Sequence, residues 1–297
     1  MYRTSVITRH TFIEAIVQPI YALLLALGGV ILCIFGLLPF FTLGEDTIMY
    51  KSVGLDVILL LVLIVTLFAT SRSIFEEIED RTMLTLMSKP VRKWEVLVGK
   101  YVGICLSALL AIVVLGGILI LCTALRLPGD YQLRTSSIDE NEVRQIFEMR
   151  KMNIAGLIPS LFLMWLQISV LAAIGVALST RFSLVVNLPV VILIYIAGNL
   201  TRFLFPQTGR GAVSRAFVYL LSLILPYLET FDLRQKTVYS TIKLAGTMYA
   251  TDPRGVPLSE IWAYTGVATL YAICYAAFAL AIGMWLFQGR ELGGAEG

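Results

Sequence analysis

Six long apolar runs dominate the sequence, and each is long enough to cross a lipid bilayer as a helix. They occupy residues 20–43, 53–70, 96–125, 157–179, 184–205 and 261–287. A run of about 18 or more apolar residues predicts a transmembrane helix. In lipid, only helices and closed barrels satisfy every backbone hydrogen bond. The sequence therefore predicts an all-α polytopic membrane protein with six or seven transmembrane helices.

Composition supports a membrane protein and excludes other classes. The chain is 58% hydrophobic and 14% charged, whereas soluble domains contain about 25% charged residues. A net charge of +3, without basic and aromatic residues interleaved, gives no indication of nucleic-acid binding. No internal repeat or low-complexity linker divides the chain, so we expect one membrane domain over residues 1–297.

The segment before the last run leaves the number of crossings open. Residues 212–228 form a shorter apolar stretch that contains Arg215 and Pro226. This stretch either spans the membrane or enters and leaves on the same side, within a re-entrant or external segment at 206–260. Six spans place both termini on one side, and seven place them on opposite sides. The density of Lys and Arg favours cytoplasmic termini by a modest margin.

Two polar segments are predicted to be helical outside the spans. Residues 1–19 mix basic and apolar side chains and predict an amphipathic helix on the membrane surface. Within the insert at 126–153, Ser137 and Glu140 have the spacing of a capping box, which predicts an external helix over residues 138–152. That helix either packs over the ends of the spans or provides a site for an external partner.

The loop at 72–95, between the second and third runs, has an unusual order of charges. Acidic residues crowd its first part and basic residues its last part, an order that favours a helix because it opposes the helix dipole. Phe75, Ile78, Thr82 and Leu86 recur at helical spacing, and Pro90 ends the pattern. The loop is either an amphipathic helix at the membrane surface or an ordinary solvated loop with interfacial charges.

Catalytic chemistry is not indicated. His10 is the single histidine, so a histidine-based triad or metal site is excluded, and no Walker A motif is present. We therefore expect no enzyme and no bound cofactor or metal. Within the runs the polar groups are few: Asp56 near the start of the second, and the amides of Gln167, Asn187 and Asn199. Such amides either join helices or bind substrate.

The loop resembles that of a known family, the type-2 ABC transporter permeases, between their second and third spans. The acidic cluster at 76–80 precedes Arg-Thr-Met-Leu at 81–84, Leu-Met-Ser-Lys-Pro-Val-Arg-Lys-Trp-Glu at 86–95, and Gly99-Lys100. Arg81 replaces a glycine found in many members, and Lys93 replaces the usual arginine. The form of residues 79–82 is most similar to the branch associated with copper-enzyme maturation.

This resemblance implies six spans, a re-entrant segment, and both termini in the cytoplasm of a bacterium, with the protein in the inner membrane. It implies a homodimer of permeases beneath which two ATP-binding subunits hold ATP and Mg²⁺. Residues 76–90 would be the coupling helix. The residues implied to contact the ATPase are Glu76, Glu77, Glu79, Asp80, Arg81, Thr82, Ser88, Lys89, Pro90 and Arg92.

Two functions remain open from the sequence. The first is the permease subunit of an ATP-driven exporter. The second is a membrane scaffold or sensor whose ATPase drives remodelling or signalling to an external partner, such as a periplasmic protein, without transport. The sequence does not name a substrate.

Overall fold

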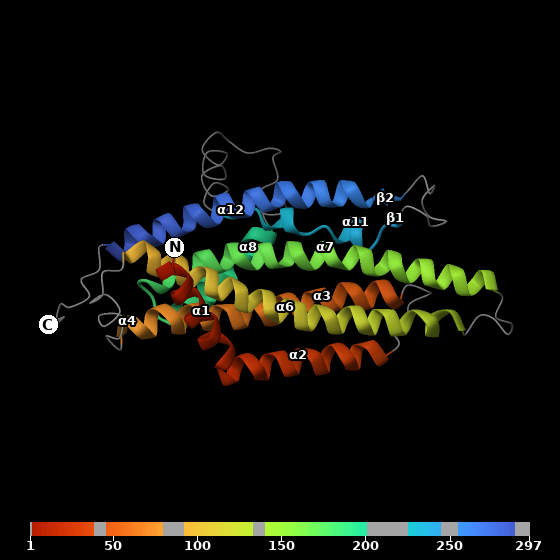
Figure 1. Ribbon diagram of the computed structural model, residues 1–297, viewed down its shortest axis with the longest axis horizontal. Coiled ribbons are helices and arrows are strands. Elements are labelled where there is room, and N and C mark those ends of the chain that lie inside the picture. Colours follow the sequence, from red (N-terminus) through yellow and green to blue (C-terminus); the bar gives the residue numbers. More distant parts are fainter. Residues whose placement is uncertain are drawn as a thin grey trace.

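The computed structural model of the chain is an elongated bundle of long helices that lie side by side (Figure 1). The structure describes residues 2–38, 46–79, 92–132, 140–200, 225–244 and 255–288. Its long helices are α1 (Tyr2–Val17), α2 (Pro19–Leu37), α3 (Asp46–Ser71), α6 (Lys93–Gln132), α7 (Glu140–Ser179), α8 (Leu184–Asn199) and α12 (Leu258–Gln288). Short elements are η1 (Arg72–Glu76), α4 (Glu77–Glu79), η2 (Leu228–Phe231), α11 (Arg234–Thr237), β1 (Ile242–Lys243) and β2 (Val256–Pro257).

Among the described residues, five helices are long and apolar enough to cross a membrane. These spans correspond to five of the six apolar runs, and the all-helical prediction is confirmed apart from the parallel β1–β2 pair. The remaining run, 184–205, contributes the 16-residue helix α8, which is shorter than a full span. The last five residues of this apolar run, 201–205, lie outside the described ranges. A sixth span and a re-entrant segment therefore stay predictions.

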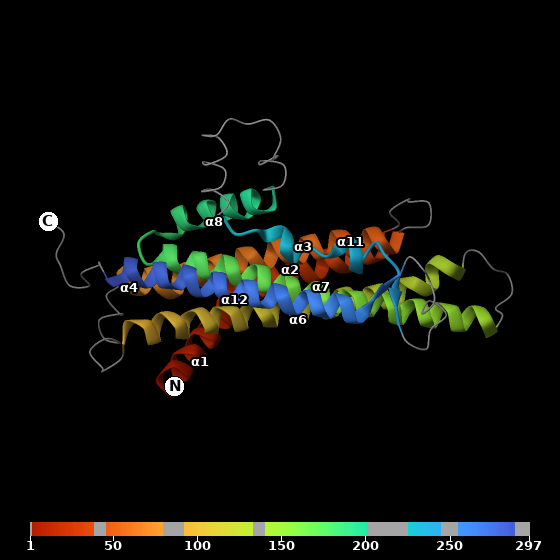
Figure 2. The ribbon, with the colours of Figure 1, turned by 90° about the horizontal axis from the view of Figure 1, so that it is seen from above.

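The described ends of the chain lie at the same end of the bundle. Lys93, at the start of α6, places its ammonium 5.2 Å from the ring centre of Phe287 in α12. Arg181 contacts the carbonyl of Leu286, also in α12. Figure 2 shows α1, α4 and the last turns of α12 toward this end, while α11 lies nearer the other. We call the end of the bundle that contains α4 the α4 end, and the opposite end the β1–β2 end.

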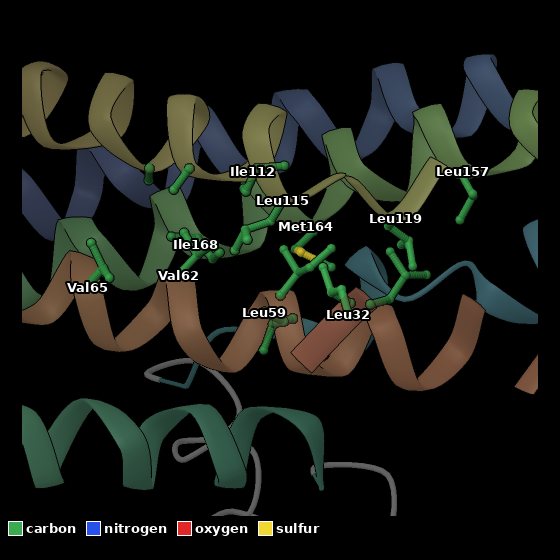
Figure 3. Close-up of a cluster of buried hydrophobic side chains, with 14 of the residues drawn as sticks. Leu32, Leu59, Val62, Val65, Ile112, Leu115, Leu119, Leu157, Met164 and Ile168 are labelled. Atoms are coloured by element: carbon green, nitrogen blue, oxygen red, sulfur yellow. The ribbon is translucent and has the colours of Figure 1, made fainter. Parts of the chain in front are cut away.

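The core fills the space between α2, α3, α6 and α7. Figure 3 shows Leu32, Leu59, Leu115 and Met164, one from each of these helices, packed together. Polar groups reinforce the apolar contact, since the Tyr21 hydroxyl donates to the carbonyl of Ser107 at 2.9 Å. Direct packing and buried hydrogen bonds hold helices together in lipid, where little hydrophobic driving force exists between them.

Helix α1 is docked on α6. Gly99 and Gly103 of α6 face it, and a Cβ on Gly103 would lie only 2.8 Å from the carbonyl oxygen of Thr8. The Thr8 hydroxyl donates to the carbonyl of Gly99 at 3.1 Å. Val17 and other apolar side chains of α1 stay exposed. The predicted N-terminal helix is therefore present, and one of its faces is covered by α6.

The insert at 126–153 does not form a helix separate from the spans. Instead, α6 continues to Gln132, and α7 begins at Glu140 and runs without a break to Ser179. Arg126 donates to the carbonyls of Phe35 and Leu38, at 3.0 and 2.9 Å, and so caps the end of α2. The helix predicted over 138–152 is thus the first part of α7, which continues through Gly156 into the span.

Candidate functional site: the α3–α6 junction and a polar cavity

The acidic residues of the 72–95 loop begin on a continuation of α3. After Ser71 the chain forms one π-helical turn, η1, and then α4, which ends at Glu79. Residues 72–79 therefore continue α3, and most of the amphipathic helix predicted over residues 76–90 lies outside the described residues. No proline or glycine interrupts the chain between Thr70 and Glu79, so α3 runs on. The predicted site residues Asp80, Arg81, Thr82, Ser88, Lys89 and Pro90 lie outside the described residues.

A buried ion pair ties this continuation to α6. The Lys100 ammonium lies 2.6 Å from Glu77 Oε1, and the side chains of Lys100 and Glu77 are 3% and 22% exposed. The same ammonium donates to Ser73 Oγ at 3.1 Å and to the Ser73 carbonyl. Three acceptors thus compensate a cation that would otherwise be costly to bury. We call Ser73, Glu77 and Lys100 the junction site.

The π-helical turn places the junction site within reach of α6. A π turn inserts one residue into a helix and rotates the residues that follow, and such turns are frequent at functional sites. Here it buries Ser73, Ile74 and Ile78 while Glu76 and Glu79 stay exposed. Within the described ranges, Glu76 pairs with Arg72, four residues earlier in the chain, at 3.5 Å.

The other predicted residue that the structure describes, Arg92, is exposed at the entry to α6. Its backbone N–H donates to Glu95 Oε2 at 3.0 Å, which caps the helix in the manner of a capping box. Of the four predicted site residues that the structure describes, Glu77 contacts α6 through its side chain. Sequence reasoning missed Lys100 as a member of the site. The signal was an isolated lysine at the start of an apolar run, seven residues after Lys93.

A polar cavity lies on another side of α3. It has a volume of about 420 Å³ and is lined by α3, α7, α8 and the η2–α11 segment. Its polar lining residues are Asp56, Ser160, Gln167, Tyr195, Asn199, Glu229, Asp232 and Arg234. Asp56 and Glu77 are 21 positions apart on one nearly continuous helix, about 30 Å at 1.5 Å per residue. The cavity and the junction site are therefore separate features.

An ion pair joins two walls of the cavity. Arg234 NH1 lies 2.6 Å from Asp56 Oδ1, and Arg234 Nε lies 3.6 Å from Asp232 Oδ1. The Asp232 carboxylate also accepts the backbone N–H of Arg234 at 3.1 Å. Asp56 and Arg234 are far apart in sequence, so the pair fixes α11 against α3.

The amides inside the runs mainly join helices. Asn187 of α8 donates to Ser179 Oγ of α7 at 2.7 Å, and it also contacts the carbonyl of Gly175. Gln167 of α7 reaches Asn199 of α8 at 3.5 Å, a long contact. The helix-joining interpretation is confirmed for Asn187, whereas Gln167 and Asn199 also line the cavity.

Among the residues that the structure describes, no three His, Cys, Asp or Glu side chains come together in a way that would hold a metal ion. Comparison with known sequences identifies the chain at the level of the family. No curated protein matches it. The model of the ABC-2 family of transporter proteins matches residues 10–292, and its description gives no support to the copper-enzyme-maturation branch. Because this match covers nearly all of the 297 residues, the chain belongs to the ABC-2 family of transporter proteins and is a membrane permease component.

Proposed function

We propose that this permease is half of an ATP-driven exporter and that residues 72–95 form the segment through which a separate ATPase drives it. ABC-2 permeases pair with ABC ATPase subunits. The observation that carries the proposal is the junction site, where Lys100 of α6 contacts Glu77 of α4 at 2.6 Å. ATP and Mg²⁺ would be held by the ATPase subunits.

The junction site supplies a mechanical link between the loop and two spans. Residues 80–91 connect Glu79 to Arg92, and the Glu77–Lys100 pair joins the helices on both sides of that connection. A displacement of the loop would therefore move α3 and α6 together. Because α1 packs on the first turns of α6, it would move with them. An ATPase that binds one position of this unit more tightly shifts the equilibrium toward it.

The arrangement of the ends supports a cytoplasmic location for both termini. The described ends, in α1 and α12, lie with α4 at one end of the bundle. If α4 faces an ATPase, these ends are cytoplasmic, as in a bacterial inner-membrane protein. We further propose that two copies of the chain form the permease dimer.

One observation favours the second function, in which the ATPase drives remodelling or signalling to an external partner. Helices α6 and α7 contain 40 residues each, or about 60 Å at 1.5 Å per residue. The hydrocarbon core is about 30 Å thick. The pair therefore extends beyond the apolar layer, and a periplasmic protein could bind its outer turns.

Charge reversal tests the coupling role. Glu79→Lys with Asp80→Lys should leave the permease inserted and folded, because single exposed ion pairs contribute only about 0–1 kcal/mol. The variant should lose copurification of a coexpressed partner ATPase, since unpaired charges in a desolvated interface cost about 2–5 kcal/mol.

The matched control is Asp139→Lys with Glu140→Lys, which makes the same change in charge within the 126–153 insert. This control should retain the ATPase. Normal copurification and substrate-stimulated hydrolysis in the Glu79/Asp80 variant would show that the loop is only solvated. ATP-dependent flux of a defined substrate into vesicles would separate export from the scaffold function.

A further inference from the structure

The cavity beside α3 has the size and lining of a small-molecule site. Its volume of about 420 Å³ lies within the roughly 300–1,000 Å³ typical of ligand pockets. We propose that it binds an amphipathic organic ammonium, meaning a positively charged amine on a short apolar body. This proposal concerns binding alone and does not depend on the coupling role of the 72–95 loop.

The charges that line the cavity favour a cation. Three carboxylates, those of Asp56, Glu229 and Asp232, face a single guanidinium, that of Arg234. Arg234 is already compensated by contacts to Asp56 and Asp232, at 2.6 and 3.6 Å. Among the described lining residues, carboxylates therefore outnumber cations, and a cleft of one sign attracts the opposite charge.

An amide inside the cavity can bind a polar group of a ligand. The Gln167 side chain lines the cavity from α7, and the residue is only 5% exposed. Its amide nitrogen makes one long contact, 3.5 Å to Asn199 Oδ1, so the amide is weakly bonded to its neighbour. The amide oxygen is an acceptor to which an ammonium N–H can donate.

The rest of the lining suits the apolar body of such a ligand. Leu55, Leu59 and Met164 form an aliphatic wall between the polar groups. The rings of Tyr195 and Phe231 also line the cavity, and aromatic faces attract ammonium groups. Charge, acceptor and apolar wall together select a cationic amphiphile over an anion or a sugar.

The same chemistry has two sources in a membrane. One is a free amine-bearing amphiphile, and the other is the ammonium headgroup of an aminated phospholipid such as phosphatidylethanolamine. Both present N–H donors and a positive charge next to an apolar body. The experiment therefore needs one arm for each source.

Binding is measured on the full chain in nanodiscs of phosphatidylcholine, by isothermal titration with hexylammonium, and empty nanodiscs provide the partition blank. Hexanoate and hexanol serve as the anionic and neutral probes of equal length. We expect saturable binding of hexylammonium, and affinity about tenfold weaker or undetectable for the other two. Equal binding of hexylammonium and hexanoate, or no saturable binding, would overturn the proposal.

Two variants place the binding in the cavity. Asp232→Asn removes one negative charge and keeps an acceptor for the Arg234 backbone N–H, and Gln167→Leu removes the amide at similar volume. Each should weaken hexylammonium binding about tenfold, with an unchanged circular dichroism spectrum. Glu76→Gln is the matched control, because it removes one charge at the α4 end. Wild-type affinity in both cavity variants would refute the assignment.

The second arm adds phosphatidylethanolamine to the nanodiscs. Competition with hexylammonium in the wild type, lost in Gln167→Leu, would identify the lipid headgroup as an occupant. Unchanged hexylammonium affinity in the presence of the lipid would assign the cavity to a free amphiphile.

Discussion

The junction site makes a quantitative prediction, because its two charges are buried to different extents. Lys100 is 3% exposed and Glu77 is 22% exposed. Glu77→Gln leaves the ammonium buried beside Ser73 without a counter-charge. Removing one member of a buried pair costs about 3–5 kcal/mol. We expect about 3 kcal/mol in the free energy of unfolding, since the glutamine oxygen still accepts one hydrogen bond.

Removing the cation should cost less. In Lys100→Met the aliphatic packing is largely kept, and the partly exposed Glu77 can be hydrated, so the loss is one charged hydrogen bond of about 1.5 kcal/mol. The double variant buries no charge and should be more stable than Glu77→Gln alone. A double-mutant cycle should therefore give a coupling of at least about 1 kcal/mol.

The assay is equilibrium unfolding in mixed micelles, in which a rising fraction of dodecyl sulfate is followed by circular dichroism. Glu76→Gln is the control, because the exposed Arg72–Glu76 pair should contribute only about 0–1 kcal/mol. If Glu77→Gln is no less stable than this control, the Lys100 ammonium is not held as we describe. Strict additivity of the two single changes would contradict a direct pair.

Three further predictions follow from packing, topology and the missing phosphate loop. Gly156→Ala should lower stability by about 1–3 kcal/mol, because its Cβ would lie 2.4 Å from the Thr237 carbonyl, whereas Gly117→Ala, with nothing within 4 Å, should be neutral or stabilising in the same unfolding assay. With the native cysteines replaced, cysteines introduced at positions 140 and 290 should be labelled from the outside at 140 only; labelling at 290 but not at 140 would contradict the proposed orientation. The purified chain should neither bind nor hydrolyse ATP, and hydrolysis that survives removal of contaminating ATPases would refute this.

Hydropathy predicts the long helices because crossing a bilayer requires length and apolarity, and both are local properties of the sequence. It does not predict where a helix ends at the membrane surface. The order of charges in the 72–95 loop predicts an amphipathic helix at the membrane surface but does not show that its first residues continue α3. The backbone of residues 72–79 continues α3 through a π turn, since charged residues with good helix propensity do not break a helix. The same reason explains why α7 begins at Glu140 and not near Leu157.

Neither the ion pair of Lys100 nor the cavity could be found from the sequence, although the lysine itself stands out in an apolar run. A lysine near the end of a span is normally expected to reach the interface, and its burial depends on the position of Glu77 across the junction. The cavity depends on Arg234 meeting Asp56, two residues joined by no local pattern. Long-range pairs of this kind are set by how helices pack, which periodicity does not encode.

The central claim is that the loop after α4 contacts the ATPase, and site-specific photocrosslinking tests it most directly. A photoreactive phenylalanine analogue would replace Glu79, and in a second variant Glu260 at the first turn of α12, near the β1–β2 end. The coexpressed ATPase should become covalently attached through position 79 and not through position 260. Attachment through position 260 without attachment through position 79 would contradict the account.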